Sequence, residues 1–152
     1  MKTIKWNGDS VTILDQRLLP SKEEYHTYTE YYDVAEAITS METRGAPAIG
    51  ITAGMGIALG AKKIKKKNMA EFKEEMNRIF DCFAATRPTA VNLFWTINRM
   101  KKTLSESETM EQAIQKFEKE ALLILEEDIA ANKQMGKNGS KFLQDGDIVM
   151  TH

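Results

Sequence analysis

The chain has a single cysteine and almost no net charge. Because Cys82 is the only cysteine among 152 residues, no disulfide can form within the chain, which excludes a disulfide-stapled secreted domain and favours a reducing compartment. The 21 basic and 22 acidic side chains leave a net charge of -1. This balance provides no electrostatic reason to expect nucleic acid or an anionic membrane as a main partner.

Long hydrophobic segments of the kind that target or span membranes are also missing. The first ten residues, MKTIKWNGDS, contain no apolar stretch typical of a signal peptide. One run without charged side chains, residues 45–61, interrupts a sequence otherwise rich in Lys and Glu. It is slightly shorter than a spanning helix and rich in Gly and Ala, so a buried core helix is favoured over a membrane span.

Common motifs of metal and nucleotide sites are absent from the sequence: there is no zinc-ligand spacing, no P-loop and no GxGxxG turn. Isolated reactive side chains are better explained by structure. Cys82 falls in an amphipathic helical stretch without a visible base, which is typical of a buried structural thiol. His26, in the tyrosine-rich segment 24–31, is expected to pack or hydrogen-bond. Asp128 and Asn132, one helical turn apart, indicate either a satisfied polar cluster or a ligand contact.

The hydrophobic pattern predicts a small sheet followed by helices. Two β-prone runs, 3–6 and 10–16, flank an Asn-Gly-Asp turn and predict a β-hairpin, and segment 24–31 is a candidate third strand. Helical spacing then begins after Asp33, which we expect to be an N-cap. Later helical stripes are centred on residues 72–83, 93–104 and 112–125, the last opened by a capping-box pattern at Thr109 and Gln112.

The uncharged run predicts a second helix with unusual packing. Pro47 suits its first turn, where no N–H partner is lost. Four glycines, Gly50, Gly54, Gly56 and Gly60, interrupt it, and each costs roughly 1 kcal/mol relative to alanine inside a helix. We therefore expect close approach by neighbouring helices to offset this cost.

The last eight residues, DGDIVMTH, differ from the rest of the chain. A turn followed by a continuous apolar run is typical of a parallel strand buried on both faces. We therefore expect residues 1–144 to form a first domain and residues 145–152 to begin a second. A ligand of that second domain would bind beyond the carboxyl end of this strand, as in open α/β sheets. The expected fold class is α+β: a small antiparallel hairpin sheet followed by a helical domain, with the first strand of a second domain at the chain end.

Two arginines precede predicted helices in similar ways. Arg44 stands ahead of the helix that begins near Pro47, and Arg87 ahead of the fourth helix. The first turn of a helix offers unpaired N–H groups and a partial positive charge that suit a phosphate, and an arginine adds a fork of donors. Gly45 removes the side chain where a ligand would approach. The alternative is that each arginine caps a neighbouring helix or pairs with a carboxylate such as Glu42.

Three segments resemble one family over nearly the whole chain. TRGAPAIGITAGMGIALGA (43–61), TRPTAVNLFWTINRM (86–100) and DGDIVMTH (145–152) are similar to the N-terminal half of the methylthioribose-1-phosphate isomerases. These enzymes share a superfamily with the regulatory subunits of translation initiation factor 2B. The opening segment IKWNGDSVTILDQRLLP (4–20) also fits the start of the family.

This resemblance implies a cytoplasmic, homodimeric enzyme of methionine salvage that converts 5-methylthioribose 1-phosphate to 5-methylthioribulose 1-phosphate without a cofactor. It implies a Rossmann-like C-terminal domain, whose first strand would lie in residues 145–152, and substrate binding at Arg44, Gly45 and Ala46 and at Arg87. The family's catalytic cysteine follows a strand ending in Thr-His, here Thr151-His152, and its aspartate lies further on, while Cys82 does not match. The chain is therefore expected to be a fragment that is inactive alone.

Two alternatives remain open within the resemblance. One is an isomerase of a related substrate, 5-deoxyribose 1-phosphate or ribose 1,5-bisphosphate, since the residues quoted do not determine the group at C5. The other is a non-catalytic regulatory subunit that senses a phosphorylated metabolite.

Overall fold

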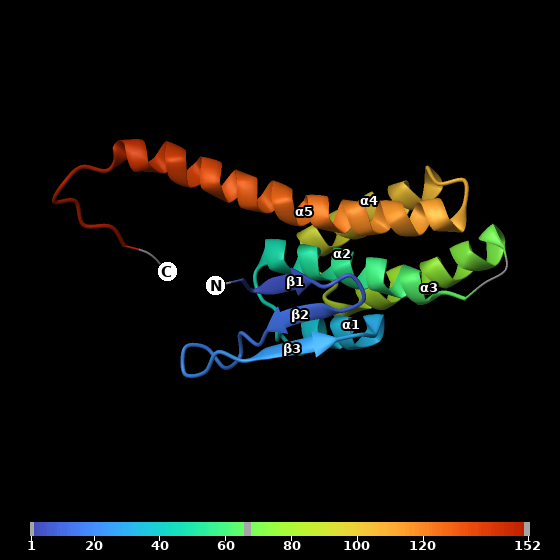
Figure 1. Cartoon of the computed structure of the whole chain (residues 1–152). Helices are drawn as coiled ribbons and strands as arrows, with labels where there is room; N and C mark the ends of the chain where they lie inside the picture. Colours follow the sequence, from blue (N-terminus) through green and yellow to red (C-terminus); the bar gives the residue numbers. More distant parts are fainter. Residues whose placement is uncertain (1, 66–67, 151–152) are drawn as a thin grey trace.

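The computed structural model describes residues 2–65 and 68–150, which form a three-stranded sheet followed by helices (Figure 1). The strands are β1 (Ile4–Trp6), β2 (Val11–Leu14) and β3 (Tyr25–Tyr28). The helices are α1 (Tyr31–Thr39), α2 (Ala46–Lys63), α3 (Met69–Thr86), α4 (Val91–Ser105), α5 (Met110–Gly139) and the short 3-10 helix η1 (Ser140–Phe142). The predicted α+β class, with a small antiparallel sheet ahead of a helical domain, is confirmed.

The sheet has the order β1-β2-β3, with both pairs antiparallel. The predicted hairpin turns at Gly8, whose φ of +95° is a conformation that glycine adopts without strain. Ile4 lies opposite Ile13 in the register, and both are buried toward the helices. One face of the sheet thus lies on the helical core, although Leu14, next to Ile13 on β2, is buried as well.

Helix α1 begins at Tyr31, with Glu30 at the N-cap position, so the prediction that Asp33 caps it is wrong. Tyr31 packs against Gly60 of α2, where a Cβ would lie 3.2 Å from its side chain. This tertiary contact extends the helix upstream of the position that local sequence favours. Asp33 instead lies in the first turn, where a carboxylate suits the helix dipole.

Helix α2 forms the centre of the molecule and contacts α1, α3, α4, α5, β1 and β2. Pro47 lies in its first turn, as predicted, and the helix is buried from Ile49 to Ala61. Its glycines meet neighbouring helices directly: a Cβ on Gly56 would come within 2.3 Å of Phe83 in α3. Within residues 2–65 and 68–150, none of the helices combines the length and apolar character needed to cross a lipid bilayer.

Helix α5 runs along α2 and then projects past the other helices (Figure 1). Its predicted capping box is present in part: the Gln112 N–H donates to Thr109 Oγ1 (3.2 Å), but the Gln112 side chain accepts from the N–H of Glu108 (2.7 Å), not from that of the N-cap residue Thr109. Residues 130–139, in the projecting half, are exposed. The Asn132 amide donates to the carbonyl of Asp128 in the preceding turn, so its polar group is satisfied within the helix.

The predicted strand near the chain end is not formed among the described residues 145–150. Ile148 is 99% exposed, and Val149 and Met150 are exposed as well. A parallel strand needs neighbouring strands for its main-chain hydrogen bonds and cover for both faces, and within the described part of the chain none lies beside this segment. Thr151 and His152 lie outside the described residues, and the assignment of 145–152 to a second domain stays a prediction.

Candidate functional site

The N-terminal ends of α2 and α4 lie side by side. A Cβ on Gly50, in the first turns of α2, would lie 3.0 Å from the carbonyl oxygen of Asn92, in the first turn of α4. The close approach allowed by glycine thus brings both helix starts, and the residues just before them, to one end of the helical layer. Two positive ends of helix dipoles meet there.

Neither of these helix starts carries a side-chain cap. The N-cap residues are Gly45 for α2 and Ala90 for α4, and neither side chain can accept a hydrogen bond. In contrast, Asn68 and Thr109 cap α3 and α5 through their side-chain oxygens. Pro47 in α2 has no N–H, and at α4 the Ala90 and Leu93 N–H groups donate to main-chain carbonyls (both 3.0 Å). The other first-turn N–H groups of the two helices lack an acceptor from a capping side chain and suit an anionic ligand.

The two arginines predicted to bind substrate stand at these helix starts. Arg44 is exposed and Arg87 is half-buried at the C-cap position of α3. Within the described residues, neither guanidinium forms a hydrogen bond or an ion pair with another side chain. The expected alternative of an Arg44–Glu42 pair is not observed, since Glu42 binds Tyr28, His26 and Arg17 instead.

Gly45 turns the chain between Arg44 and α2. Its φ of +91° lies in the region that favours glycine, and within the described structure no atom lies within 4 Å of a Cβ built there. The turn therefore requires glycine for its backbone conformation and leaves open space in front of it. Ala46, the first residue of α2, is exposed beside it.

A hollow of about 390 Å³ lies between the starts of α2 and α4 and the second half of α5. It is mostly apolar; its lining includes Pro47, Gly50, Asn92, Trp95, Thr96 and Asp128. Neither Arg44 nor Arg87 lines it. The hydroxyl of Thr96 is buried without a hydrogen-bond partner among the described residues.

Among the residues that line this hollow, sequence reasoning singled out Asp128 as a possible ligand contact but missed Trp95 and Thr96. Trp95 and Thr96 lie within the quoted motif at 86–100, but the helical period there had been assigned only to core packing. The available signal was that Trp95 lies two residues from both Leu93 and Ile97, off the predicted apolar stripe; in the structure its side chain is 49% exposed.

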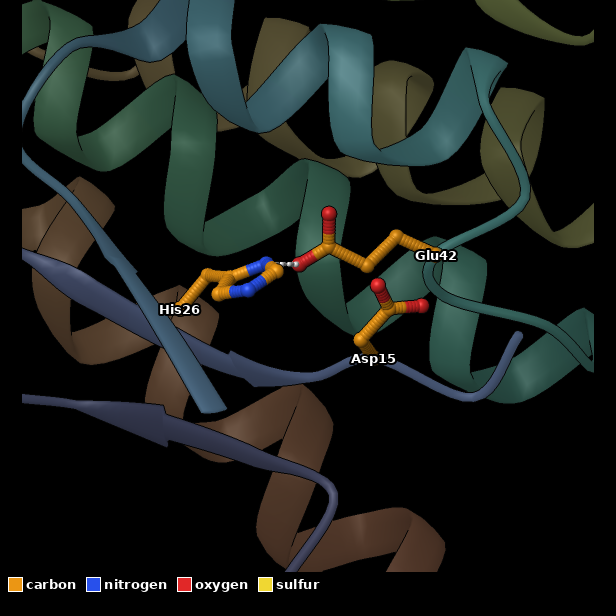
Figure 2. A group of neighbouring side chains, drawn as sticks. All are labelled: Asp15, His26 and Glu42. Atoms are coloured by element: carbon orange, nitrogen blue, oxygen red, sulfur yellow. Dashed lines mark hydrogen bonds and ion pairs between the residues drawn. The ribbon is translucent and has the colours of Figure 1, made fainter. Parts of the chain in front are cut away.

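A second polar cluster lies under the sheet, between β2, β3 and the loop before α2 (Figure 2). The carboxylate of Glu42, a residue that is 2% exposed, accepts a hydrogen bond from Tyr28 Oη (2.7 Å) and pairs with His26 Nδ1 (3.1 Å). Asp15, also buried, accepts from Arg17 Nε (2.8 Å) and Nη2 (2.6 Å). Arg17 Nη2 also approaches Glu42 at 3.5 Å, so the guanidinium links the two carboxylates.

Charge pairing shifts the protonation of these groups. The hydrogen bond from Arg17 lowers the pKa of Asp15 below its usual range, against the effect of burial. The hydrogen bond to Glu24 raises the pKa of His26, with Glu42 adding to the effect. Because both ring nitrogens of His26 face carboxylates, the imidazolium form, with two N–H donors, fits both contacts.

Asp15, His26 and Glu42 have the ligand types of a metal site, yet their donor atoms are already engaged. Both oxygens of Asp15 bind Arg17, and the two oxygens of Glu42 bind Tyr28 and His26. A divalent ion would have to displace a guanidinium and strip protons from the ring. The cluster therefore fits an internal ion-pair network, and the expected hydrogen-bonding role of His26 is confirmed.

Cys82, on α3, is half-buried. Burial raises the pKa of its thiol, which leaves it protonated and poorly nucleophilic near neutral pH. This agrees with the predicted structural role.

Comparison with known proteins identifies relatives of two kinds. Residues 42–152 match the model of the Initiation factor 2 subunit family. Methylthioribose-1-phosphate isomerase 1 of Pseudothermotoga lettingae is 45% identical over 150 residues, and that of Fervidobacterium nodosum is 48% identical over 152. Each match covers 99% of this chain but only 43% of the relative, so the chain spans less than half the length of these relatives.

The solved structures of similar fold also include an isomerase and an initiation-factor subunit. The crystal structure of 5-methylthioribose 1-phosphate isomerase from Pyrococcus horikoshii superposes with a TM-score of 0.92 at 39% identity, covering 95% of this chain and 41% of that one. Translation initiation factor eIF-2B, subunit delta, from A. fulgidus gives a TM-score of 0.88 at 36% identity, covering 97% of this chain and 43% of that one.

Proposed function

The chain belongs to the Initiation factor 2 subunit family, and on that premise we propose that the protein containing it is a sugar-phosphate isomerase. Its substrate is 5-methylthioribose 1-phosphate, which it converts to the ketose 5-methylthioribulose 1-phosphate in methionine salvage. One structural observation carries the proposal: two uncapped helix starts lie side by side, each preceded by an arginine without a side-chain partner in the described residues. Identities of 45% and 48% to named isomerases support it.

The described residues contribute binding to this reaction. The phosphate sits at the starts of α2 and α4, where it accepts from first-turn N–H groups and from the guanidinium groups of Arg44 and Arg87. Gly45 and Ala46 let the sugar approach the main chain. Holding the phosphate fixes C1 and C2 for the groups that move the hydrogen between them.

The chemical step belongs to the part of the protein that follows this chain. The resemblance assigns it to a cysteine and an aspartate beyond His152, in a second, Rossmann-like domain. The proposed reaction needs no cofactor, because C1, at the oxidation level of an aldehyde, is reduced while C2 is oxidised to the ketone. The two changes balance when hydrogen moves from C2 to C1 within the substrate, as protons or as a hydride. A homodimer in the cytoplasm is the proposed state of the whole protein.

A regulatory subunit that senses a phosphorylated metabolite is the second candidate. The likeness to the A. fulgidus initiation-factor subunit favours it. Both functions use the same phosphate site, so the site alone does not separate them. They differ in whether a bound sugar phosphate is turned over.

The experiment is to incubate the complete gene product separately with 5-methylthioribose 1-phosphate, 5-deoxyribose 1-phosphate and ribose 1,5-bisphosphate, and to follow ketose formation by NMR. We expect turnover to be fastest with the methylthio sugar. Faster turnover of another sugar would change the substrate assignment. Binding without turnover of any of the three would favour the regulatory candidate.

A further inference from the structure

The loop that leads into the proposed binding turn is shaped at the C-terminal end of α1. The Glu42 N–H donates to the carbonyl of Ala37 (3.0 Å), and the Met41 N–H donates to that of Ile38 (3.2 Å). Met41 adopts φ +62°. This pair of bonds around a left-handed residue is a Schellman motif, and it fixes the direction in which the chain leaves α1.

An unusual residue occupies the position after the left-handed one. A Schellman motif commonly places an apolar side chain there, to pack against the helix. This chain places Glu42 there, with its carboxylate 2% exposed. A buried carboxylate is tolerated only when donors surround it, and here Tyr28, His26 and Arg17 supply them.

The donors come from a different part of the fold. Tyr28 and His26 lie on β3, and Arg17 lies in the loop after β2. The main chain of Glu42 is held as well, because its carbonyl accepts from the Gln16 N–H at 2.9 Å. The side chain and the main chain of one residue thus tie the loop to the sheet side of the molecule.

The proposed ligand-binding residues come directly after Glu42 and Thr43 in the chain. Thr43 is fully buried and contacts Thr52 of α2 through their hydroxyls (3.4 Å). The next residue, Arg44, is exposed, and Gly45 has open space before it. We propose that Glu42 is a positioning residue, which fixes the Arg44–Gly45 turn through its contacts with the sheet and so holds the phosphate site ready for its ligand.

The reason is the cost of ordering. A turn that contains a glycine with positive φ and an exposed arginine has many alternative conformations, and a ligand would have to select one. Fixing the turn before binding removes that cost from the affinity. The effect of Glu42 on phosphate binding rests on the proposed function. The ordering of residues 42–45 by Glu42 does not depend on it.

The first test compares Glu42→Gln with Glu118→Gln in the complete gene product. Glu118 is a matched control: its partly buried carboxylate also ties the sheet to the helices, through Trp6 (2.8 Å) and Lys62 (3.1 Å), but far from the turn in sequence. We expect Glu42→Gln to raise KM for 5-methylthioribose 1-phosphate about tenfold with kcat changed less than about threefold, because uniform binding is lost. Glu118→Gln should leave KM within about twofold.

A Glu42→Gln variant that leaves KM unchanged, or two variants that raise it equally, would overturn the proposal. Tyr28→Phe covers the case in which Glu42→Gln does not fold, since it keeps the carboxylate and removes one donor. Its KM should rise about threefold, because one of the hydrogen bonds that hold the Glu42 carboxylate is lost. An unchanged KM in a folded Tyr28→Phe protein would count against the proposal in that case.

Amide hydrogen exchange separates this inference from the proposed function. Exchange at residues 43–45 should be at least about tenfold faster in Glu42→Gln than in Glu118→Gln, measured without ligand. If the wild-type protein does not act on the sugar phosphate, the proposed function fails, while this difference in exchange still supports the positioning role of Glu42. Equal exchange in the two variants would refute the positioning role of Glu42, whatever the substrate.

Discussion

Gly50 lies against the main chain of Asn92: a Cβ on Gly50 would be 3.0 Å from the Asn92 carbonyl oxygen and 2.9 Å from Thr96 Oγ1. The first of these atoms is main chain and cannot rotate away. A side chain at position 50 would therefore push the starts of α2 and α4 apart. Since the proposed phosphate site is made of these two helix starts, this contact links packing directly to binding.

Gly50→Ala should lower both stability and ligand affinity. Overpacking of this kind costs about 1–3 kcal/mol, and the separated helix starts should raise KM for the sugar phosphate. Gly136→Ala is the control, because a Cβ there meets no atom of the described structure within 4 Å apart from its own stretch of helix, and it should stabilise α5 by up to about 1 kcal/mol. Thermal melting and steady-state kinetics check both; equal stability of the two variants would contradict the packing account.

Arg44→Ala and Arg87→Ala should each weaken binding more than stability. Loss of a charge-assisted hydrogen bond to the ligand costs about 1.5–3 kcal/mol, roughly ten- to a hundredfold in affinity. Because neither guanidinium has a side-chain partner in the described residues, the free energy of unfolding should change by less than about 0.5 kcal/mol.

Arg78→Ala provides the control for the two arginine variants. Arg78 is an exposed residue of α3 that pairs with Glu74 (2.8 Å) and Glu75 (3.2 Å), and its loss should leave the kinetics unchanged. Kinetics and melting are measured side by side. An Arg44 or Arg87 variant that loses stability but keeps kcat/KM would identify that arginine as structural.

Met41→Gly should stabilise the protein. Met41 holds φ +62°, a conformation that costs a side-chain-bearing residue roughly 1–2 kcal/mol, and glycine is the usual residue at this position of a Schellman motif. Part of the gain is offset by the greater freedom of glycine in the unfolded chain. Met41→Ala is the control, since alanine keeps the penalty. Chemical denaturation should rank Gly above Ala, and the reverse order would contradict the strain.

The stability contribution of His26 should fall as pH rises. The folded-state pKa of His26 is raised above its ordinary value of 6.5, so the folded protein binds the proton more tightly than the unfolded chain does. The contribution is therefore fully present below pH 6.5 and is lost as the pH rises through the raised pKa. It should stay below about 1 kcal/mol, because the ring is one-third exposed and solvent screens its partners.

The measurement compares the free energy of unfolding of the wild type with that of His26→Gln between about pH 5.5 and 9. Glutamine cannot titrate, so groups shared by both proteins cancel in the difference. The advantage of the wild type should shrink with rising pH. A difference that is constant, or that grows with pH, would show that the imidazolium is not the form that binds Glu42 and Glu24.

Much of the local structure follows from the sequence alone. The Asn7-Gly8 turn, Pro47 in the first turn of α2 and the Thr109 cap are all where the residues predicted them. Each depends on steric limits and hydrogen bonds within a few residues. The uncharged, glycine-containing run 45–61 likewise predicted a buried helix with closely packed neighbours. It did not identify which helices those neighbours are.

The tertiary structure decided which distant residues meet. Tyr31 joins α1 because it packs on Gly60. The Glu42 network gathers side chains from the loop after β2, from β3 and from the loop before α2, which no local period signals. The apolar run 148–150 is a strand by composition but remains unpaired in the described chain, because a strand exists only through its neighbours. Arg44 and Arg87 were identified one by one from sequence, but the contact of Gly50 with Asn92 is what brings their helices together. Such long-range contacts form cooperatively, when whole surfaces fit.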